Sequence, residues 1–174
     1  MGLGGLQDIG GARFVFEDVT SLLKAQKVIA ESRFSHFVLD RTPYDYVQTP
    51  KESGYRSIHF AYKYVSENAD YDGLRVELQI RTRLQHDWAM AVETAELISK
   101  SSLKAGLGNE HWLSFFKLSS AVFARKEGMP VAESFKDYTE KEYCLAYAAL
   151  DRDNKFLDQL QALVSAVHIT EQHS

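Results

Sequence analysis

Two segments of the sequence alternate apolar and polar side chains, and their polar members are of the types that handle phosphate groups. The segments run from residue 55 to residue 64 and from residue 74 to residue 81. Period-two alternation is typical of strands with one buried and one exposed face, so paired strands would merge their polar residues into one surface. This surface, the polar face, would carry His59, Lys63, Arg75, Glu77, Gln79 and Arg81.

The mixture of groups favours chemistry over a merely solvated strand face, which is the alternative interpretation. Cations bind phosphate, an aromatic ring can stack on a base, and a carboxylate can hold Mg²⁺ or accept a proton. The stretch 51–56, which leads into the first segment, adds Lys51, Tyr55 and Arg56 around a glycine. These are the parts that a phosphoryl-transfer site needs.

The remaining residues before position 82 predict the strands, helix and loops that would position this surface. Short β-rich runs predict strands at 12–16 and 36–39, and apolar spacing predicts a helix over 19–31 with Asp18 or Thr20 as its N-cap. Two prolines make 42–54 a predicted loop, and 65–73 reads as a hairpin loop with an Asp-Gly turn.

The pattern changes near residue 82, after which the periodicity is helical. It predicts an amphipathic helix directly after Thr82, a second helix over 112–125, and one or two more between about 138 and 167. Breaks are expected at 106–109 and around Gly128 and Pro130.

Composition excludes several classes of protein. A net charge of −4 argues against general DNA binding, because such binding depends mainly on positive charge that attracts the phosphate backbone. The single cysteine, Cys144, excludes an internal disulfide framework and a multi-cysteine zinc site, and its apolar helical setting predicts a small buried side chain. The sequence shows neither a signal peptide nor an apolar run of the ~18–20 residues that span a membrane, so we expect a cytoplasmic protein without a membrane partner.

Three motifs in this sequence resemble those of RelA/SpoT synthetases. Residues 44–59, YDYVQTPKESGYRSIH, are similar to the pattern D-Y-I-x-x-P-K-x-x-G-Y-x-S-x-H, and residues 76–82 look like the E-x-Q-I-R-T strand. Residues 7–13 resemble the entry strand D-[LI]-x-G-x-R. The motifs occur in the family's order, cover about residues 7–95, and look nearest to the stand-alone, single-domain members.

The resemblance implies an α/β (α+β) fold, with a nucleotidyltransferase-like mixed sheet flanked by helices. Residues 1–100 would form the synthetase-like core, and residues 101–174 a helical extension of the same domain. The implied activity is Mg²⁺-dependent transfer of pyrophosphate from ATP to the 3′-hydroxyl of GDP or GTP, which yields the alarmones (p)ppGpp.

The resemblance also assigns roles residue by residue. Glu77 would be the catalytic glutamate and would share Mg²⁺ with Asp8, while Arg13 would bind the donor nucleotide. The acceptor nucleotide would be contacted by Lys51, Tyr55, His59 and Gln79, with the ring of Tyr55 exposed for stacking on the base. Arg56 and Arg81 would bind phosphate or serve as structural ion-pair partners.

One departure from the family leaves alternatives open. The family places a helical segment and a basic ATP-binding loop before the aspartate strand, whereas Asp8 stands almost at the start of this sequence. The chain is therefore expected to lack the cations that clamp the donor triphosphate, and a catalytically impaired or truncated nucleotide-binding remnant is the alternative to an active enzyme. A toxin-type relative acting on adenine nucleotides or on the 3′ end of tRNA is a further alternative. The oligomeric state is not indicated.

Overall fold

The structure is a computed structural model that describes residues 10–99, 102–105 and 107–162. The chain forms two compact units: the first holds the residues up to Gln48 together with 56–83, and the second holds 49–55 and the residues from Leu84 onward. The change of pattern near residue 82 thus coincides with the boundary along the chain. The sequence does not indicate that residues 49–55, which lie between two parts of the first unit, belong to the helical unit.

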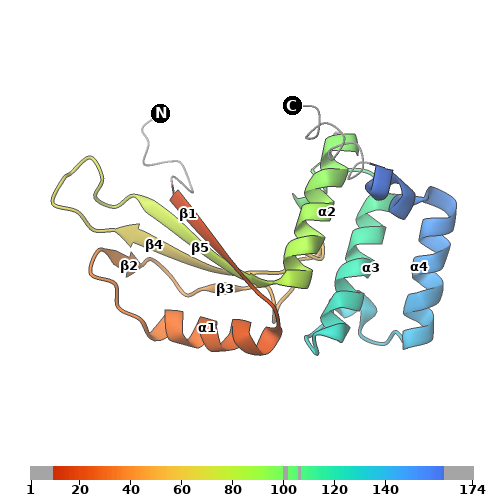
Figure 1. Ribbon diagram of the computed structural model, residues 1–174, viewed down its shortest axis with the longest axis horizontal. Helices are drawn as coiled ribbons and strands as arrows, with labels where there is room; N and C mark the ends of the chain where they lie inside the picture. The colour runs from red at the N-terminus through yellow and green to blue at the C-terminus, as the bar shows by residue number, and fades with distance from the viewer. Residues whose placement is uncertain (1–9, 100–101, 106, 163–174) are drawn as a thin grey trace. The chain divides into compact units, whose positions relative to one another are not determined.

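The first unit is built on a mixed β-sheet (Figure 1). Its elements are β1 (Gly10–Phe16), α1 (Val19–Glu31), β2 (Phe37–Leu39), β3 (Tyr44–Asp45), β4 (Ile58–Tyr64) and β5 (Arg75–Thr82). The strand order is β1-β5-β4-β2, with β3 also paired to β4. β1 runs parallel to β5 and the other pairs are antiparallel. The expected α/β class with a mixed sheet is confirmed.

Helix α1 covers one face of this sheet (Figure 1). It begins and ends where the sequence predicts, and the Asp18 carboxylate caps it by accepting the Ser21 N–H at 2.7 Å. Leu22 of the helix is fully buried, as are Ile58, Phe60 and Ile80 on alternate positions of β4 and β5. The apolar side of the alternation therefore forms the core, and the polar side lies on the opposite face of the sheet.

The predicted loop 42–54 is wrong in one respect, because Tyr44 and Asp45 form a strand. The Asp45 carboxylate accepts the N–H groups of Val47 and Gln48 at 3.0 and 2.9 Å, and its other oxygen accepts the Gln26 side-chain amide from α1 at 3.0 Å. These bonds turn the chain directly after β3 and tie the strand to α1. β4 itself begins at residue 58 rather than at 55.

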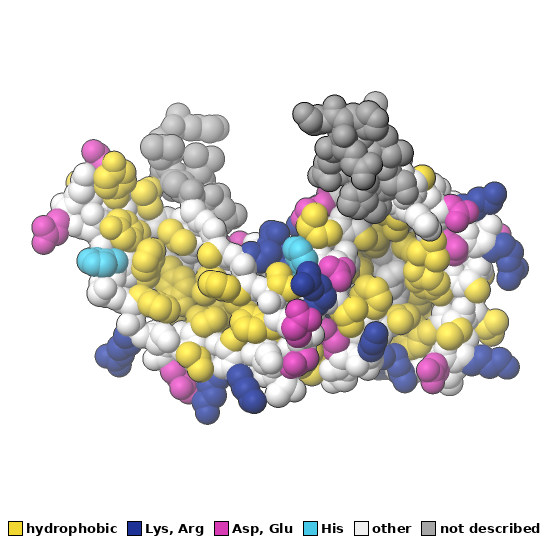
Figure 2. Space-filling view, in the orientation of Figure 1, with side chains coloured by type: hydrophobic (Ala, Val, Ile, Leu, Met, Phe, Trp, Pro, Cys, Tyr) yellow, Lys and Arg dark blue, Asp and Glu magenta, His cyan; other side chains and the backbone are white. Residues whose placement is uncertain are grey.

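Aromatic side chains lie exposed at the β2 edge of the sheet. Tyr62 makes edge contacts with the rings of Phe34 and Phe37, and Phe37 also packs against Tyr64. Figure 2 shows hydrophobic side chains gathered over this end of the sheet, where Phe34, Phe37 and Val38 are partly exposed. The short, three-residue β2 limits how much of this edge another strand could pair with.

The second unit is helical. It contains α2 (Arg83–Ser99), the short 3₁₀ helices η2 (Leu103–Ala105) and η3 (Glu133–Phe135), α3 (Glu110–Lys126) and α4 (Glu140–Asn154). Trp88 anchors α2 to α3, since its indole N–H donates to the Phe116 carbonyl at 2.9 Å. The helices after Thr82 and at 112–125 are confirmed, and the predicted helical region beyond residue 162 lies outside the described residues. No helix in the described ranges is long and apolar enough to cross a membrane.

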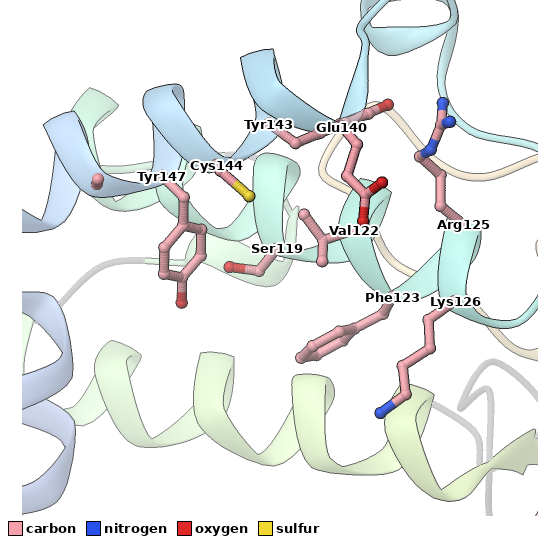
Figure 3. A pocket seen from close by; sticks show the side chains of 10 residues that line it. Ser119, Val122, Phe123, Arg125, Lys126, Glu140, Tyr143, Cys144 and Tyr147 are labelled. Atoms are coloured by element: carbon pink, nitrogen blue, oxygen red, sulfur yellow. The ribbon is translucent and has the colours of Figure 1, made fainter.

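The expectation that Cys144 is buried is wrong. On α4 the side that packs on α3 carries the buried Tyr143 and the partly buried Tyr147 and Leu150. Cys144 lies one position outside this stripe and is exposed. It borders a groove of about 730 Å³ between α3 and α4, which Figure 3 shows from close by.

Gly54 allows a close approach that a larger residue would prevent. Its φ is +89°, and a Cβ there would lie 2.9 Å from the Ser120 Cβ and 3.3 Å from a Trp88 ring carbon. We expect Gly54→Ala to lower the free energy of unfolding by about 2–4 kcal/mol, from left-handed strain plus overpacking.

Gly128→Ala is the matched control in the same unit. Gly128 has φ +68° with no atom within 4 Å of a built Cβ, so the substitution should cost about 1 kcal/mol, from the strain alone. Urea unfolding followed by tryptophan fluorescence measures both. Equal losses for the two variants would contradict the close approach at Gly54.

Candidate functional site

The pairing of β4 and β5 assembles the polar face. His59 lies opposite Gln79, Ala61 opposite Glu77, and Lys63 opposite Arg75. Residues directly opposite each other in a sheet project from the same face. The sequence-based prediction that the two polar sets merge is therefore confirmed.

Glu77 is held at the centre of this face by both of its oxygens. The imidazole Nδ1 of His59 lies 2.6 Å from Glu77 Oε1, and the side-chain amide of Gln79 donates to Oε2 at 2.6 Å. The side chains of Glu77 and His59 are 22% and 13% exposed. The carboxylate is thus fixed in orientation and still reachable from solvent.

These contacts lower the pKa of Glu77 below its usual value. The hydrogen bond to His59 contributes most, partial burial acts in the opposite direction, and the bond to Gln79 and the charges of His59 and Arg41 lower the pKa further. Glu77 is accordingly a carboxylate at neutral pH, able to orient a hydroxyl group and take its proton or to ligate a cation.

Arg13 lies on β1, the other strand that pairs with β5. The parallel register of β1 and β5 places Gly11 next to Glu77 and Arg13 next to Gln79. Arg13 is exposed. The sheet order therefore puts the predicted donor-binding arginine on one side of Glu77 and His59 on the other.

Lys51 and Tyr55 belong to the second unit. The expectation of an exposed Tyr55 ring is wrong, because only 4% of the residue is exposed. The Trp88 ring packs against it with centroids 6.4 Å apart, and the ammonium groups of Lys51 and Lys104 lie 5.2 and 5.6 Å from its centre. The predicted roles of Lys51 and Tyr55 in binding the acceptor nucleotide stay predictions.

Arg56 and Arg81 are both buried, at 4% and 0% exposed. A guanidinium nitrogen of Arg56 donates to the Val47 carbonyl at 3.0 Å. Burial in the folded core favours the structural role for both arginines over direct contact with phosphate.

The predicted Mg²⁺ site combines one described and one undescribed residue, since Asp8 lies outside the described residues. Within the described part of the chain, no group of three or more His, Cys, Asp or Glu residues converges on a metal position. Mg²⁺ usually takes only one or two protein carboxylates and completes its shell with water and substrate phosphates. The partly exposed Glu77 carboxylate fits that chemistry.

A family model described as "Region found in RelA / SpoT proteins" matches residues 3–102. The chain belongs to the RelA/SpoT family. All the described residues of the polar face lie within the matched region. A curated relative, the GTP pyrophosphokinase YwaC of Bacillus subtilis, is 29% identical over 87 residues, which are 48% of this chain and 39% of the relative.

Solved structures of small alarmone synthetases share the fold. Small alarmone synthetase 1 of Bacillus subtilis, solved with its product pppGpp, is 25% identical with a TM-score of 0.58, over 72% of this chain and 60% of that one. Small alarmone synthetase 2 of the same organism is 19% identical with a TM-score of 0.57, over 72% and 64%. This RelA/SpoT chain thus spans about two-fifths to two-thirds of the length of these relatives.

The sequence analysis assigned no role to Arg41, Tyr44 or Tyr46, which the structure places around His59 and Glu77. The two tyrosine rings are stacked, and Tyr46 packs edge-on against His59. The signal was present as a Tyr-x-Tyr alternation at 44–46, which a loop assignment concealed.

The groove between α3 and α4, by contrast, is lined by none of the predicted site residues of this RelA/SpoT chain (Figure 3).

The lowered pKa of Glu77 predicts how stability responds to acid. A carboxylate whose pKa is depressed by folding stabilises the native state above its unfolded pKa, near 4.5, and this contribution is lost as the pH falls through the native value. We expect the free energy of unfolding to fall more between pH 6 and pH 3.5 in the wild type than in Glu77→Gln, measured by urea unfolding.

The His59 contact can be tested directly. We expect His59→Ala to raise the pKa of Glu77 towards 4.5, because the largest lowering contribution is removed. The carboxyl ¹³C shift of Glu77 against pH measures it. A wild-type Glu77 that titrates at 4.5 or above would contradict the arrangement.

Proposed function

We propose that this chain is a pyrophosphotransferase that moves pyrophosphate from ATP to the 3′-hydroxyl of GDP or GTP. The observation that carries the proposal is the Glu77 carboxylate fixed between His59 and Gln79 on the polar face. Membership of the RelA/SpoT family supports it, as does the likeness to a synthetase solved with pppGpp.

Glu77 is the proton acceptor in this proposal. As the 3′ oxygen of the acceptor bonds to the β-phosphorus of ATP, its proton passes to the Glu77 carboxylate, and the bond between that phosphorus and the oxygen of the α-phosphate breaks to release AMP. His59 and Gln79 hold the carboxylate so that little reorientation is needed, which is the positioning that phosphoryl transfer requires.

The neighbours of Glu77 bind the two substrates on opposite sides. Arg13 on β1 contacts the phosphates of the donor, and His59 on β4 contacts the acceptor. Gln79 contributes a buried side-chain oxygen that has no hydrogen-bond partner among the described residues, and this oxygen is suited to accept a bond from a substrate hydroxyl or amino group.

Glu77, together with Asp8, would hold Mg²⁺. When bound, the ion would offset the charge of the donor phosphates.

The test is a product assay with ATP and Mg²⁺ and, in parallel, GDP, GTP, adenine nucleotides or uncharged tRNA. We expect a 3′-pyrophosphorylated guanine nucleotide, and a loss of about 10²–10⁴-fold in kcat in Glu77→Gln, because the proton acceptor is removed. Glu67→Gln, the same change on the exposed loop between β4 and β5, is the control and should retain full activity.

Other outcomes would replace the proposal with a named alternative. A product formed only with adenine nucleotides or tRNA would indicate a toxin-type relative. Folded protein that gives no product with any acceptor would indicate a nucleotide-binding remnant.

A further inference from the structure

Arg41 follows β2 after Asp40, and its contact with Tyr44, which lies opposite His59, puts it on the polar-face side of the sheet. Its guanidinium carbon is 4.7 Å from the centre of the Tyr44 ring, a cation–π distance, and both side chains are exposed. This contact fixes a cation that would otherwise sample many rotamers in solvent.

The Tyr44 ring is the first of three rings that lead to the catalytic carboxylate. Tyr44 and Tyr46 are stacked with centroids 5.7 Å apart and planes 9° apart, and Tyr46 meets His59 edge-on at 5.4 Å. His59 in turn contacts Glu77. We call Tyr44, Tyr46 and His59 the aromatic column.

Backbone pairing holds the column in place. Tyr44 lies opposite His59 in the β3–β4 register, and the Tyr46 N–H donates to the Ser57 carbonyl at 2.9 Å. Asp45, between the two tyrosines, accepts the N–H groups of the turn that follows. The column is therefore a fixed platform.

Two other exposed cations of this face, Lys63 and Arg75, share one carboxylate, that of Asp40. Lys63 and Arg75 lie 2.6 and 3.8 Å from Asp40. The Lys63 hydrogen bond lowers the pKa of Asp40 most, partial burial acts in the opposite direction, and the charges of Lys63, Arg75 and Arg41 lower the pKa further. Among the described residues of this face, Arg13 and Arg41 are the exposed arginines that form no ion pair with a carboxylate.

We infer that Arg41, seated on Tyr44, binds the 5′-phosphate groups of the acceptor nucleotide. The inference rests on the proposed function. A planar guanidinium can contact two phosphate oxygens at once, and an exposed arginine without a carboxylate partner has its donors available. The column ends on His59, the acceptor-contacting residue, whereas Arg13 lies on the far side of β5, so Arg41 serves the acceptor and Arg13 the donor.

Binding without ATP tests the inference independently of turnover. We expect Arg41→Gln to weaken binding of GDP at least tenfold by isothermal titration calorimetry, while binding of guanosine, which carries no phosphate, changes less than twofold. Arg75→Gln is the matched control: it removes an arginine already paired with Asp40, and GDP binding should change less than twofold. Arg41→Lys should restore part of the affinity, because it keeps the charge but not the bidentate geometry.

The platform is tested separately. Tyr44→Leu should weaken GDP binding in the same direction as Arg41→Gln, and the double variant should show less than the sum of the two effects, because the ring acts through the arginine. In turnover, Arg41→Gln should raise KM for the acceptor and leave kcat within twofold, as expected for a contact made equally in the ground and transition states.

Several results would overturn the inference: no GDP binding by the wild type, equal losses for guanosine and GDP, or equal losses in Arg41→Gln and Arg75→Gln. Circular dichroism of each variant serves as the control that the protein is folded. Protein that binds GDP through Arg41 but forms no 3′-pyrophosphorylated product would refute the proposed function and leave the inference standing. Formation of the product with an acceptor KM that is unchanged in Arg41→Gln would support the proposed function and refute the inference about Arg41.

Discussion

The antiparallel register between β4 and β5 is the constraint on which the rest of the candidate site depends. It places His59 opposite Gln79, and these two side chains hold the two oxygens of Glu77. A slip of one residue would turn every polar side chain of one strand towards α1 and the core. The hairpin turn opposes such a slip, since Gly73 donates to the Tyr64 carbonyl and the Tyr64 N–H donates to Leu74.

The distribution of charge on the polar face follows from the register between β4 and β5. Asp40, just after β2, faces Lys63 and Arg75, so two of the cations on this side of the sheet stabilise the sheet edge. Arg13 and Arg41 lie on opposite sides of Glu77 without an ion-pair partner among the described residues. A carboxylate between two such cations suits the proposed transfer of pyrophosphate between two anionic nucleotides, in which each arginine would hold one substrate.

Much of the first unit could be predicted from local pattern. Helix α1 matches its predicted bounds, and the alternation at 55–64 and 74–81 identified both central strands. Local signals failed where long-range contacts decided the outcome. Tyr44 and Asp45 pair with β4 despite the neighbouring prolines, because Asp45 finds partners on α1 and in the turn after it. Tyr55 is buried because Trp88, 33 residues further on, packs against it.

The sequence by itself determined the chemistry that is available. It supplied the residue types of the three motifs, the strand alternation that puts His59, Glu77 and Gln79 on one face, and the RelA/SpoT membership that the family match confirms. Only the tertiary structure decided which of these side chains contact one another. Glu77 and His59 are 18 residues apart, and Tyr44 reaches that pair through Tyr46 across a strand boundary that local pattern did not indicate. The physical reason is that period and propensity act over a few residues, whereas register, burial and charge pairing are set by segments that meet only when the sheet closes.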